Sequence, residues 1–140
     1  MGSAVITLVL PFPPSINHYY GVVQRGPCAG KVYLLPAAIT YRKRVNHAVA
    51  KQLGQDRPAL MGRLAVKVEL NEPDDGHTRD IPNYDKGLLD ALTIAGVWGD
   101  DAQIDYFQVQ RGRVIRGGRC VLQVVETSPA REQLSLLEPV

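Results

Sequence analysis

The pattern of hydrophobic and polar residues predicts four strands. Residues 4–10 form a continuous apolar run that prolines end, which is typical of a strand buried on both faces. Residues 63–70 alternate between apolar and polar side chains, and this predicts a strand with one exposed face. Residues 104–110 and 120–126 are also predicted strands, and the Gly-Gly pair between them favours a hairpin.

Two further segments have the spacing of amphipathic helices. Residues 36–53 begin with a proline, which suits a first helical turn, and are followed by a glycine that can cap the helix. Residues 82–95 show the same arrangement, with Pro82 in the first turn and Gly96 after the last. The predicted buried positions are Ile39, Val45, Val49 and Leu53 in the first helix, and Tyr84, Leu88, Ala91, Leu92 and Ala95 in the second.

The order of these elements is β-α-β-α-β-β. We therefore expect an α/β (α+β) fold of two layers, in which two main helices cover a four-stranded mixed sheet. Residues 11–35, which are rich in proline, glycine and tyrosine, are predicted to form a long loop. No repeat or linker divides the chain, so we expect residues 1–128 to form a single domain. Residues 129–140 are expected to be a C-terminal tail, either a short helix or disordered.

Length and composition are typical of a globular protein. The chain has 140 residues, of which 45% are hydrophobic and 21% are charged. No window reaches 18 consecutive apolar residues, so no membrane span is expected. The first residues are interpreted as a strand instead of a signal peptide, and Cys28 and Cys120 as two buried or half-buried thiols in a reducing cytoplasm.

Charge is distributed unevenly, although the net charge is only +2. Residues 1–70 hold nine Lys/Arg and two acids, whereas residues 71–110 hold nine acids and two basic residues. Residues 111–140 hold five arginines and three glutamates. An acidic centre between basic arms suits an enzyme that holds a cation and acts on a polyanion, and chance clustering of surface charge is the alternative.

The acidic centre contains a candidate metal site. Asp80 precedes the second predicted helix, Lys86 lies one turn into it, and Asp100 and Asp101 follow it. Hydrolysis of a phosphodiester needs an activated water and charge neutralisation, which Mg²⁺ held by a few carboxylates can supply. If the strand that starts at residue 104 lies beside the strand that ends at residue 70, these acids should lie near one edge of the sheet.

The same acids also have purely structural interpretations. Asp80 can cap the helix, and the Gly-Asp-Asp sequence can be a solvated turn. Asp90 lies four residues after Lys86, a spacing that favours a surface ion pair. The three histidines show no spacing typical of metal ligands. A small α/β protein whose acids serve only as caps and turns is therefore an open alternative.

Four motifs together resemble those of the RusA-type Holliday junction resolvases, a family of phage and prophage-derived endonucleases. They are LPFPPSINHYY at 10–20, RDIPNYDKGLLDAL at 79–92, GVWGDDAQI at 96–104 and RGGRCVLQVVE at 116–126. The motifs occur in the family's order and are spread over most of the chain, from residue 10 to residue 126. The resemblance implies a homodimeric, cytoplasmic endonuclease of a bacterial or phage-infected cell. Such an enzyme uses Mg²⁺, or Mn²⁺ in its place, to nick four-way or other branched DNA junctions during recombination and repair.

The resemblance also implies roles for individual residues. Asp80, Lys86 and Asp101 correspond to catalytic residues, and Asp80, Asp100 and Asp101 to metal ligands, with Asp85 as a further candidate ligand. Lys86 would stabilise charge on the phosphate. Tyrosines in the polar loop can stack on an unpaired base, and basic side chains can contact phosphates. The candidate DNA-binding residues are Arg79, Asn83, Tyr19, Tyr20, Arg42, Arg116 and Arg119.

One position departs from the family pattern. The first acidic motif of the family is commonly Arg-Asp-x-Asp-Asn, whereas this chain has Pro82 in place of the second aspartate. A proline side chain cannot bind a metal. The site then works with fewer carboxylates or recruits Asp85, or else the protein binds branched DNA with little or no cleavage.

Overall fold

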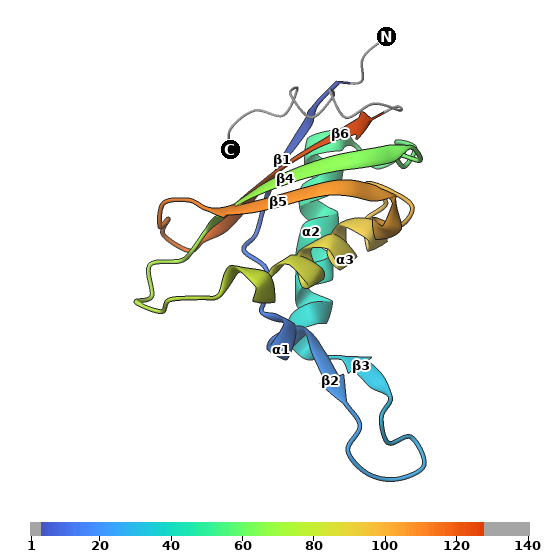
Figure 1. Ribbon diagram of the computed structural model, residues 1–140, viewed down its shortest axis with the longest axis vertical. Helices are drawn as coiled ribbons and strands as arrows, with labels where there is room; N and C mark the ends of the chain where they lie inside the picture. The colour runs from blue at the N-terminus through green and yellow to red at the C-terminus, as the bar shows by residue number, and fades with distance from the viewer. Residues whose placement is uncertain (1–3, 128–140) are drawn as a thin grey trace.

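The structure is a computed structural model that describes residues 4–127, and its main body has two layers (Figure 1). A four-stranded sheet forms one layer, and two helices that contact each other form the second. The predicted β-α-β-α-β-β order of the body is confirmed. Its elements are β1 (Ile6–Leu10), α2 (Pro36–Leu53), β4 (Arg63–Asn71), α3 (Asp85–Ile94), β5 (Ile104–Arg111) and β6 (Arg119–Thr127).

The sheet has the strand order β1-β6-β4-β5. β5 runs parallel to β4, while β6 is antiparallel to both β4 and β1, so the predicted mixed sheet is confirmed. The predicted hairpin between the last two strands is wrong, because β5 and β6 lie on opposite sides of β4. A turn does form between them, where the Gly118 N–H donates to the Ile115 carbonyl at 2.8 Å. That turn reverses the chain locally but does not determine which strand each segment pairs with.

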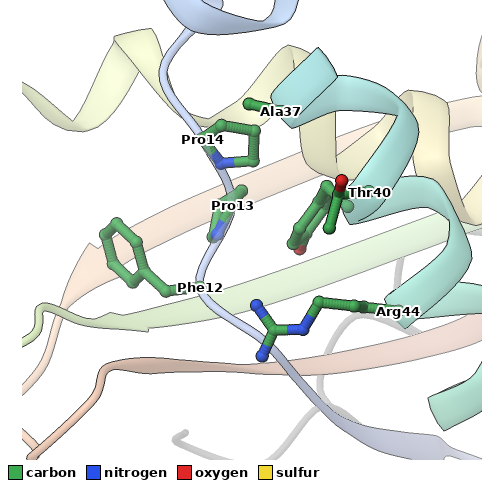
Figure 2. A pocket seen from close by; sticks show the side chains of 7 residues that line it. Phe12, Pro13, Pro14, Ala37, Thr40 and Arg44 are labelled. Carbon is green, nitrogen blue, oxygen red and sulfur yellow. The ribbon is translucent and has the colours of Figure 1, made fainter.

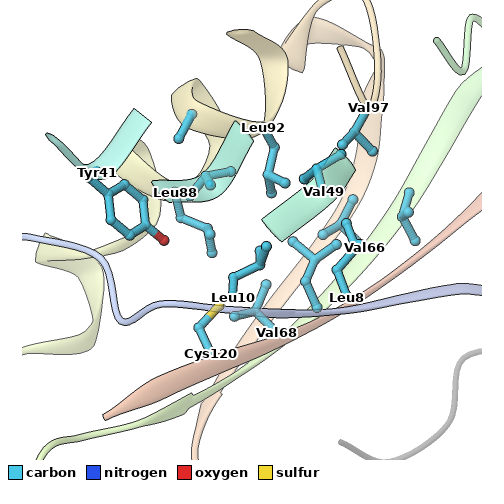
Figure 3. Close-up of a cluster of buried hydrophobic side chains, with 14 of the residues drawn as sticks. Leu8, Leu10, Tyr41, Val49, Val66, Val68, Leu88, Leu92, Val97 and Cys120 are labelled. Atoms are coloured by element: carbon cyan, nitrogen blue, oxygen red, sulfur yellow. The ribbon is translucent and has the colours of Figure 1, made fainter. Parts of the chain in front are cut away.

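The core lies between the sheet and the helices (Figure 3). Val66 and Val68 of β4 meet Val49 of α2, and Leu88 and Leu92 of α3 complete the cluster. Alternate residues of a strand share a face, which is why the apolar positions of β4 point together towards the helices.

The predicted buried stripe of α2 is partly wrong. Ile39 is 45% exposed, and Ala38 and Tyr41 occupy the buried positions before Val45 and Val49. The spacing 38, 41, 45 and 49 follows one helical face, whereas Ile39 is rotated by about 100° from Ala38. The bounds of α2 agree with the prediction, and Gly54 ends the helix with its N–H donating to the Ala50 carbonyl.

Two predictions about strand burial are also wrong. β1 is an edge strand whose exposed and buried residues alternate, so only one of its faces is buried. β4 is central, and its second face is less exposed than its alternating pattern indicated, because Ala65 packs against Val125 and Val5. Burial depends on the place of a strand in the sheet, which an apolar run alone does not reveal.

Residues 11–35 are not the long loop that their composition predicts. They contain a short helix, α1 (Ile16–Tyr19), and two strands, β2 (Tyr20–Val22) and β3 (Val32–Leu34). The two strands pair with each other in a separate two-stranded sheet, the β2–β3 hairpin. The hairpin projects away from the two-layer body (Figure 1).

The second predicted helix begins later than expected. Residues around Pro82 form a 3-10 turn, η1 (Ile81–Asn83), and the α-helix starts only at Asp85. A second 3-10 turn, η2 (Asp101–Gln103), leads into β5. Gly96, with φ of 81°, follows the helix as predicted.

No helix among the described residues is long and apolar enough to cross a membrane. Cys28 and Cys120 are both free thiols. Cys120 is buried, which raises its pKa, but Cys28 is exposed in the loop between β2 and β3, so the prediction that both thiols are at least half-buried is wrong for Cys28. The predicted C-terminal tail at 129–140 lies outside the described residues, and the single-domain boundary at residue 128 stays a prediction.

Candidate active site

Asp80 lies beside the end of the four-stranded sheet at which β4 and β5 finish. Its neighbour Arg79 makes two hydrogen bonds to Asp75 and extends over the ring of Phe12 at 5.5 Å. Arg111, the last residue of β5, donates to the Arg79 carbonyl at 2.8 Å. These contacts hold the backbone beside Asp80, and the guanidinium of Arg79 lowers the pKa of Asp75.

The Asp80 carboxylate makes no capping hydrogen bond, although Asp80 occupies the N-cap position of η1. The turn is closed instead by its backbone carbonyl, which accepts from the Asn83 N–H at 3.0 Å. Asp80 is exposed, so its carboxylate is available to bind a cation. The structural interpretation of Asp80 as a side-chain cap is therefore wrong.

Asp100 and Asp101 have different environments although they are adjacent. Asp100 caps η2: its Oδ1 accepts from the Ala102 N–H at 2.9 Å, and Gln103 Oε1 accepts from the Asp100 N–H at 2.8 Å. Asp101 is exposed and begins η2. Asp100 therefore supports the turn, while the carboxylate of Asp101 is presented to solvent.

The two acidic groups lie at opposite ends of the sheet within one chain. In the parallel register Ile104 pairs with Leu64 and Arg111 with Leu70, so β4 and β5 start at the same end. Asp101 lies just before the start of β5, whereas Asp80 is held near its end. Seven residue steps along β5 span about 23 Å. The expectation that both groups share one edge of the sheet is wrong.

The parallel connection explains this separation. A parallel crossover carries the chain back through a helix to the end of the sheet where the first strand began. α3 is that crossover, with Asp80 before it and Asp101 after it (Figure 1). Within residues 4–127, no three His, Cys, Asp or Glu side chains gather closely enough to hold a metal ion.

Lys86 and Asp85 are placed in the first turn of α3. Lys86 is exposed and forms no ion pair within the described residues, so the predicted Lys86–Asp90 pair is wrong. Asp90 is bound by Arg42 of α2 at 2.6 Å and by the Tyr19 hydroxyl at 2.5 Å. The ammonium group of Lys86 is therefore free to meet an anionic ligand.

The Arg42–Asp90–Tyr19 cluster joins α1, α2 and α3. Tyr19 is completely buried, and burial together with the Asp90 carboxylate raises its pKa. The ring of Tyr20 packs against that of Tyr19 in a tilted arrangement, with centroids 4.7 Å apart, and burial, Asp90 and Asp101 raise the pKa of Tyr20. The assignment of Tyr19, Tyr20 and Arg42 to DNA binding stays a prediction, and contact through Tyr19 would require this cluster to open.

A cavity of about 330 Å³ lies between the Phe12-Pro13-Pro14 segment and α2 (Figure 2). Arg44 is the only charged side chain among the residues that line it, so the cavity offers an apolar wall and one cation but no carboxylate ligand. The ring of Phe12 also contacts Tyr84, near the Asp80 end of the molecule. The lining residues are Phe12, Pro13, Pro14, Ala37, Thr40, Tyr41 and Arg44.

The other predicted DNA-binding residues lie around the Asp80 end of the sheet. Arg116 is exposed in the loop after β5, and Arg119 begins β6, where it donates to Asn71 at 3.4 Å. Asn83 is half-buried in η1. The sequence did not reveal that Arg111 pairs with Glu72, because their positions are 39 residues apart and no local spacing relates them.

The segments that form the candidate site also match those of known proteins. The family model for Endodeoxyribonuclease RusA matches residues 11–124. The chain belongs to the RusA family of endodeoxyribonucleases. It is 39% identical to the crossover junction endodeoxyribonuclease rusA of Enterobacteria phage HK97 over 118 residues, covering 84% of this chain and 92% of that protein. It is 32% identical to crossover junction endodeoxyribonuclease RusA of Escherichia coli K12 over 120 residues, which cover 86% and 93% of the two chains.

Membership of the RusA family confirms the resemblance drawn from the four motifs. The matched region includes both the Asp80 and the Asp101 ends of α3, as well as Lys86. The sequence did not predict that Asp90 binds Arg42 and Tyr19. The four-residue spacing between Lys86 and Asp90 favoured a pair between those two residues instead. Only a pair of covarying positions in related sequences could have indicated this contact between helices.

Proposed function

We propose that this protein is an endonuclease that cleaves four-way DNA junctions, in the cytoplasm of a bacterial or phage-infected cell. Its RusA-family relatives are named crossover junction endodeoxyribonucleases, and it covers more than nine-tenths of their length. The observation that carries the proposal is that Asp80 and Asp101 are exposed and, within the described residues, their carboxylates form no structural hydrogen bond. Acids kept free in this way are suited to bind a cation.

The proposed cofactor is Mg²⁺, with Mn²⁺ as a substitute. Carboxylate oxygens are the hard ligands that these ions prefer, and Asp80 and Asp101 would hold the ion with help from Asp100 or Asp85. When bound, the ion neutralises charge on the phosphate and lowers the pKa of the attacking water. Lys86 would contact an oxygen of the scissile phosphate, where its compact charge stabilises the charge that develops during cleavage.

The separation of Asp80 from Asp101 leads us to propose that the working unit is a homodimer with shared sites. β5 pairs on one side only among the described strands. A second copy that pairs with β5 in the antiparallel direction, around a two-fold axis, places the start of each β5 beside the end of its partner. Asp101 of one copy would then lie near Asp80 of the other. Acidic residues at one end of β5 and Arg111 at the other make this pairing electrostatically favourable.

Two shared sites also fit the reaction. Resolving a four-way junction requires a nick in each of two strands, and a two-fold symmetric dimer presents two equal sites. Lys43 and Arg44, which are exposed on α2, would contact phosphates together with Arg116 and orient the DNA without reading its sequence.

Nicking of a synthetic four-way junction tests the activity. We expect cleavage that needs Mg²⁺, stops with a chelator and is lost in Asp80→Asn and Asp101→Asn, while binding to the junction is retained. Lys51→Gln, which changes an exposed lysine near the far end of α2, is the control and should leave cleavage unchanged. Cleavage that continues in the presence of chelator would contradict the proposal.

Mixing the two inactive variants tests the shared site. If each site takes Asp80 from one copy and Asp101 from the other, a mixed dimer of Asp80→Asn and Asp101→Asn chains contains one intact site. Random exchange makes half of the dimers mixed, so about a quarter of wild-type sites should reappear. If each site lies within one chain, no mixture regains activity. The two arrangements therefore give opposite results with the same two proteins.

Pro82 supports one alternative function. It is exposed in η1, where the family commonly has a second aspartate. A protein with a weakened cation site could bind branched DNA and cleave it slowly or not at all. In that case junction binding would weaken with salt as usual, but no nick would form at any Mg²⁺ or Mn²⁺ concentration.

A further inference from the structure

The β2–β3 hairpin is an ordered arm that stands apart from the core. Its base is held where the Leu35 N–H donates to the Tyr19 carbonyl at 3.0 Å. Its tip is closed by hydrogen bonds in both directions, from the Val23 N–H to Lys31 and from the Gly30 N–H to Val23. An isolated two-stranded hairpin is only marginally stable in water, so a projecting arm of this kind is expected to meet a binding partner.

The arm carries apolar side chains on both faces. Val22 and Val32 are direct cross-strand partners, and they are 46% and 63% exposed. On the other face the ring of Tyr33 lies across Gly21, where even a Cβ atom would come within 2.5 Å of the ring. Tyr33 nevertheless remains 48% exposed. The distal part of the hairpin is therefore a thin wedge with valines on one side and an aromatic ring on the other.

The charge of the arm indicates what it binds. Arg25 and Lys31 lie at its tip, and no Asp or Glu occurs anywhere in the chain before Asp56. The neighbouring helix α2 is equally free of acids and exposes Lys43 and Arg44. A surface with one sign of charge is complementary to a polyanion, and apolar side chains between the cations favour contact with bases as well as phosphates.

We propose that the β2–β3 hairpin inserts into the branch point of the DNA junction. Val22, Val32 and Tyr33 would rest on base-pair faces that are exposed there, and Arg25 and Lys31 would contact the phosphates that converge around them. This inference rests on the proposed function, because it explains how that activity distinguishes junctions from duplex. Wedging apolar side chains between the bases of intact duplex requires unstacking, whereas at a branch point the stack is already interrupted.

A fluorescent base placed at the branch point tests the insertion. The probe is a four-way junction with 2-aminopurine at the crossover, measured with chelator so that no strand is cut. We expect the wild-type protein to increase the fluorescence several-fold, because the base loses its stacking neighbour. The double variant Val22→Ser and Val32→Ser should abolish the increase and bind the junction about tenfold more weakly, with affinity for linear duplex changed less than twofold.

Val9→Ser is the matched control. Val9 is also a strand valine and is 46% exposed like Val22, but it lies on β1 of the four-stranded sheet and not on the arm. It should leave both fluorescence and affinity unchanged. Arg25→Gln with Lys31→Gln is a second variant, which changes no apolar contact and should weaken junction binding more than duplex binding.

Three outcomes would overturn the inference. A fluorescence increase in both hairpin variants that equals the increase with the wild-type protein would show that the arm does not insert. Conversion of the valine variant to a monomer, measured by light scattering, would show that the arm clasps a second copy instead of DNA. A wild-type protein that prefers and nicks junctions without any fluorescence change would refute the insertion alone, whereas no preference and no nicking would refute the proposed function.

Discussion

Aspartates around the candidate site differ in what their carboxylates contact. Asp75 is bound by Arg79, Asp90 by Arg42 and Tyr19, and Asp100 by the backbone of η2. A carboxylate that already accepts strong hydrogen bonds has fewer lone pairs for a metal ion. Asp80 and Asp101 remain open, and for this reason they are the strongest candidates for ligands. The identity of a residue thus defines its chemistry, while its partners define whether that chemistry is available.

Pro82 is exposed, so an aspartate can be tested at this position. Pro82→Asp should restore a carboxylate two residues after Asp80, at a position where solvent can accommodate it. We expect the Mg²⁺ concentration for half-maximal junction nicking to fall about tenfold, as for a further ligand that contributes roughly 1.4 kcal/mol. Pro58→Asp, at another exposed proline, is the control for added charge. An unchanged Mg²⁺ dependence would mean that this position does not face the ion.

Among the elements, α3 has the largest influence on the site. It separates the two acidic groups, presents Lys86, and packs its Gly87 against the ring of Tyr19 in α1. That close approach lets α1 and α2 pack closely against α3 around the Arg42–Asp90–Tyr19 cluster. The same contacts fix the base from which the β2–β3 hairpin projects.

Gly87→Ala tests this packing. Alanine favours a helix over glycine by about 1 kcal/mol, but the added Cβ would lie 2.7 Å from a carbon of the Tyr19 ring. Tyr19 cannot turn away easily, because its hydroxyl is bound to Asp90 and Arg42. We expect the free energy of unfolding, measured in urea, to fall by about 1–3 kcal/mol. In a Tyr19→Ala background the substitution should become neutral or stabilising, and equal effects in both backgrounds would contradict this account.

Over the whole molecule, acidic and basic residues lie in different segments of the chain and therefore on different surfaces. The acid-free first segment forms α2 and the hairpin, whereas the acidic segment surrounds α3. This separation allows one surface to attract DNA while another holds a cation. Among residues 4–127 no further strand pairs with the outer edge of β5, and this edge is where we propose that two copies join.

The salt dependence of junction binding tests the DNA-facing surface. Each phosphate contact contributes close to one unit to the slope of log affinity against log salt concentration. Lys43→Gln with Arg44→Gln should therefore reduce the slope by about two. Lys67→Gln, on the face of β4 away from the helices, should leave the slope unchanged. Equal slopes for all three proteins would place the DNA elsewhere.

Local pattern was sufficient for many features of this protein. Helical spacing and proline and glycine signals located α2 at its observed bounds, and alternation located β4 within one residue. These features depend on residues a few positions apart, whose side chains share a face whatever the rest of the chain does. The four motifs also indicated the RusA family and the acids at both ends of α3.

Features that depend on distant segments could not be read in this way. The position of β5 beside β4, the partner of Asp90 and the hairpin within residues 11–35 all require contacts that no local period encodes. Periodicity states which side of an element is apolar but not which element will cover it. The separation of Asp80 from Asp101 follows from the parallel crossover, because a strand that restarts at the same end of the sheet leaves the residues before and after the helix about a strand length apart.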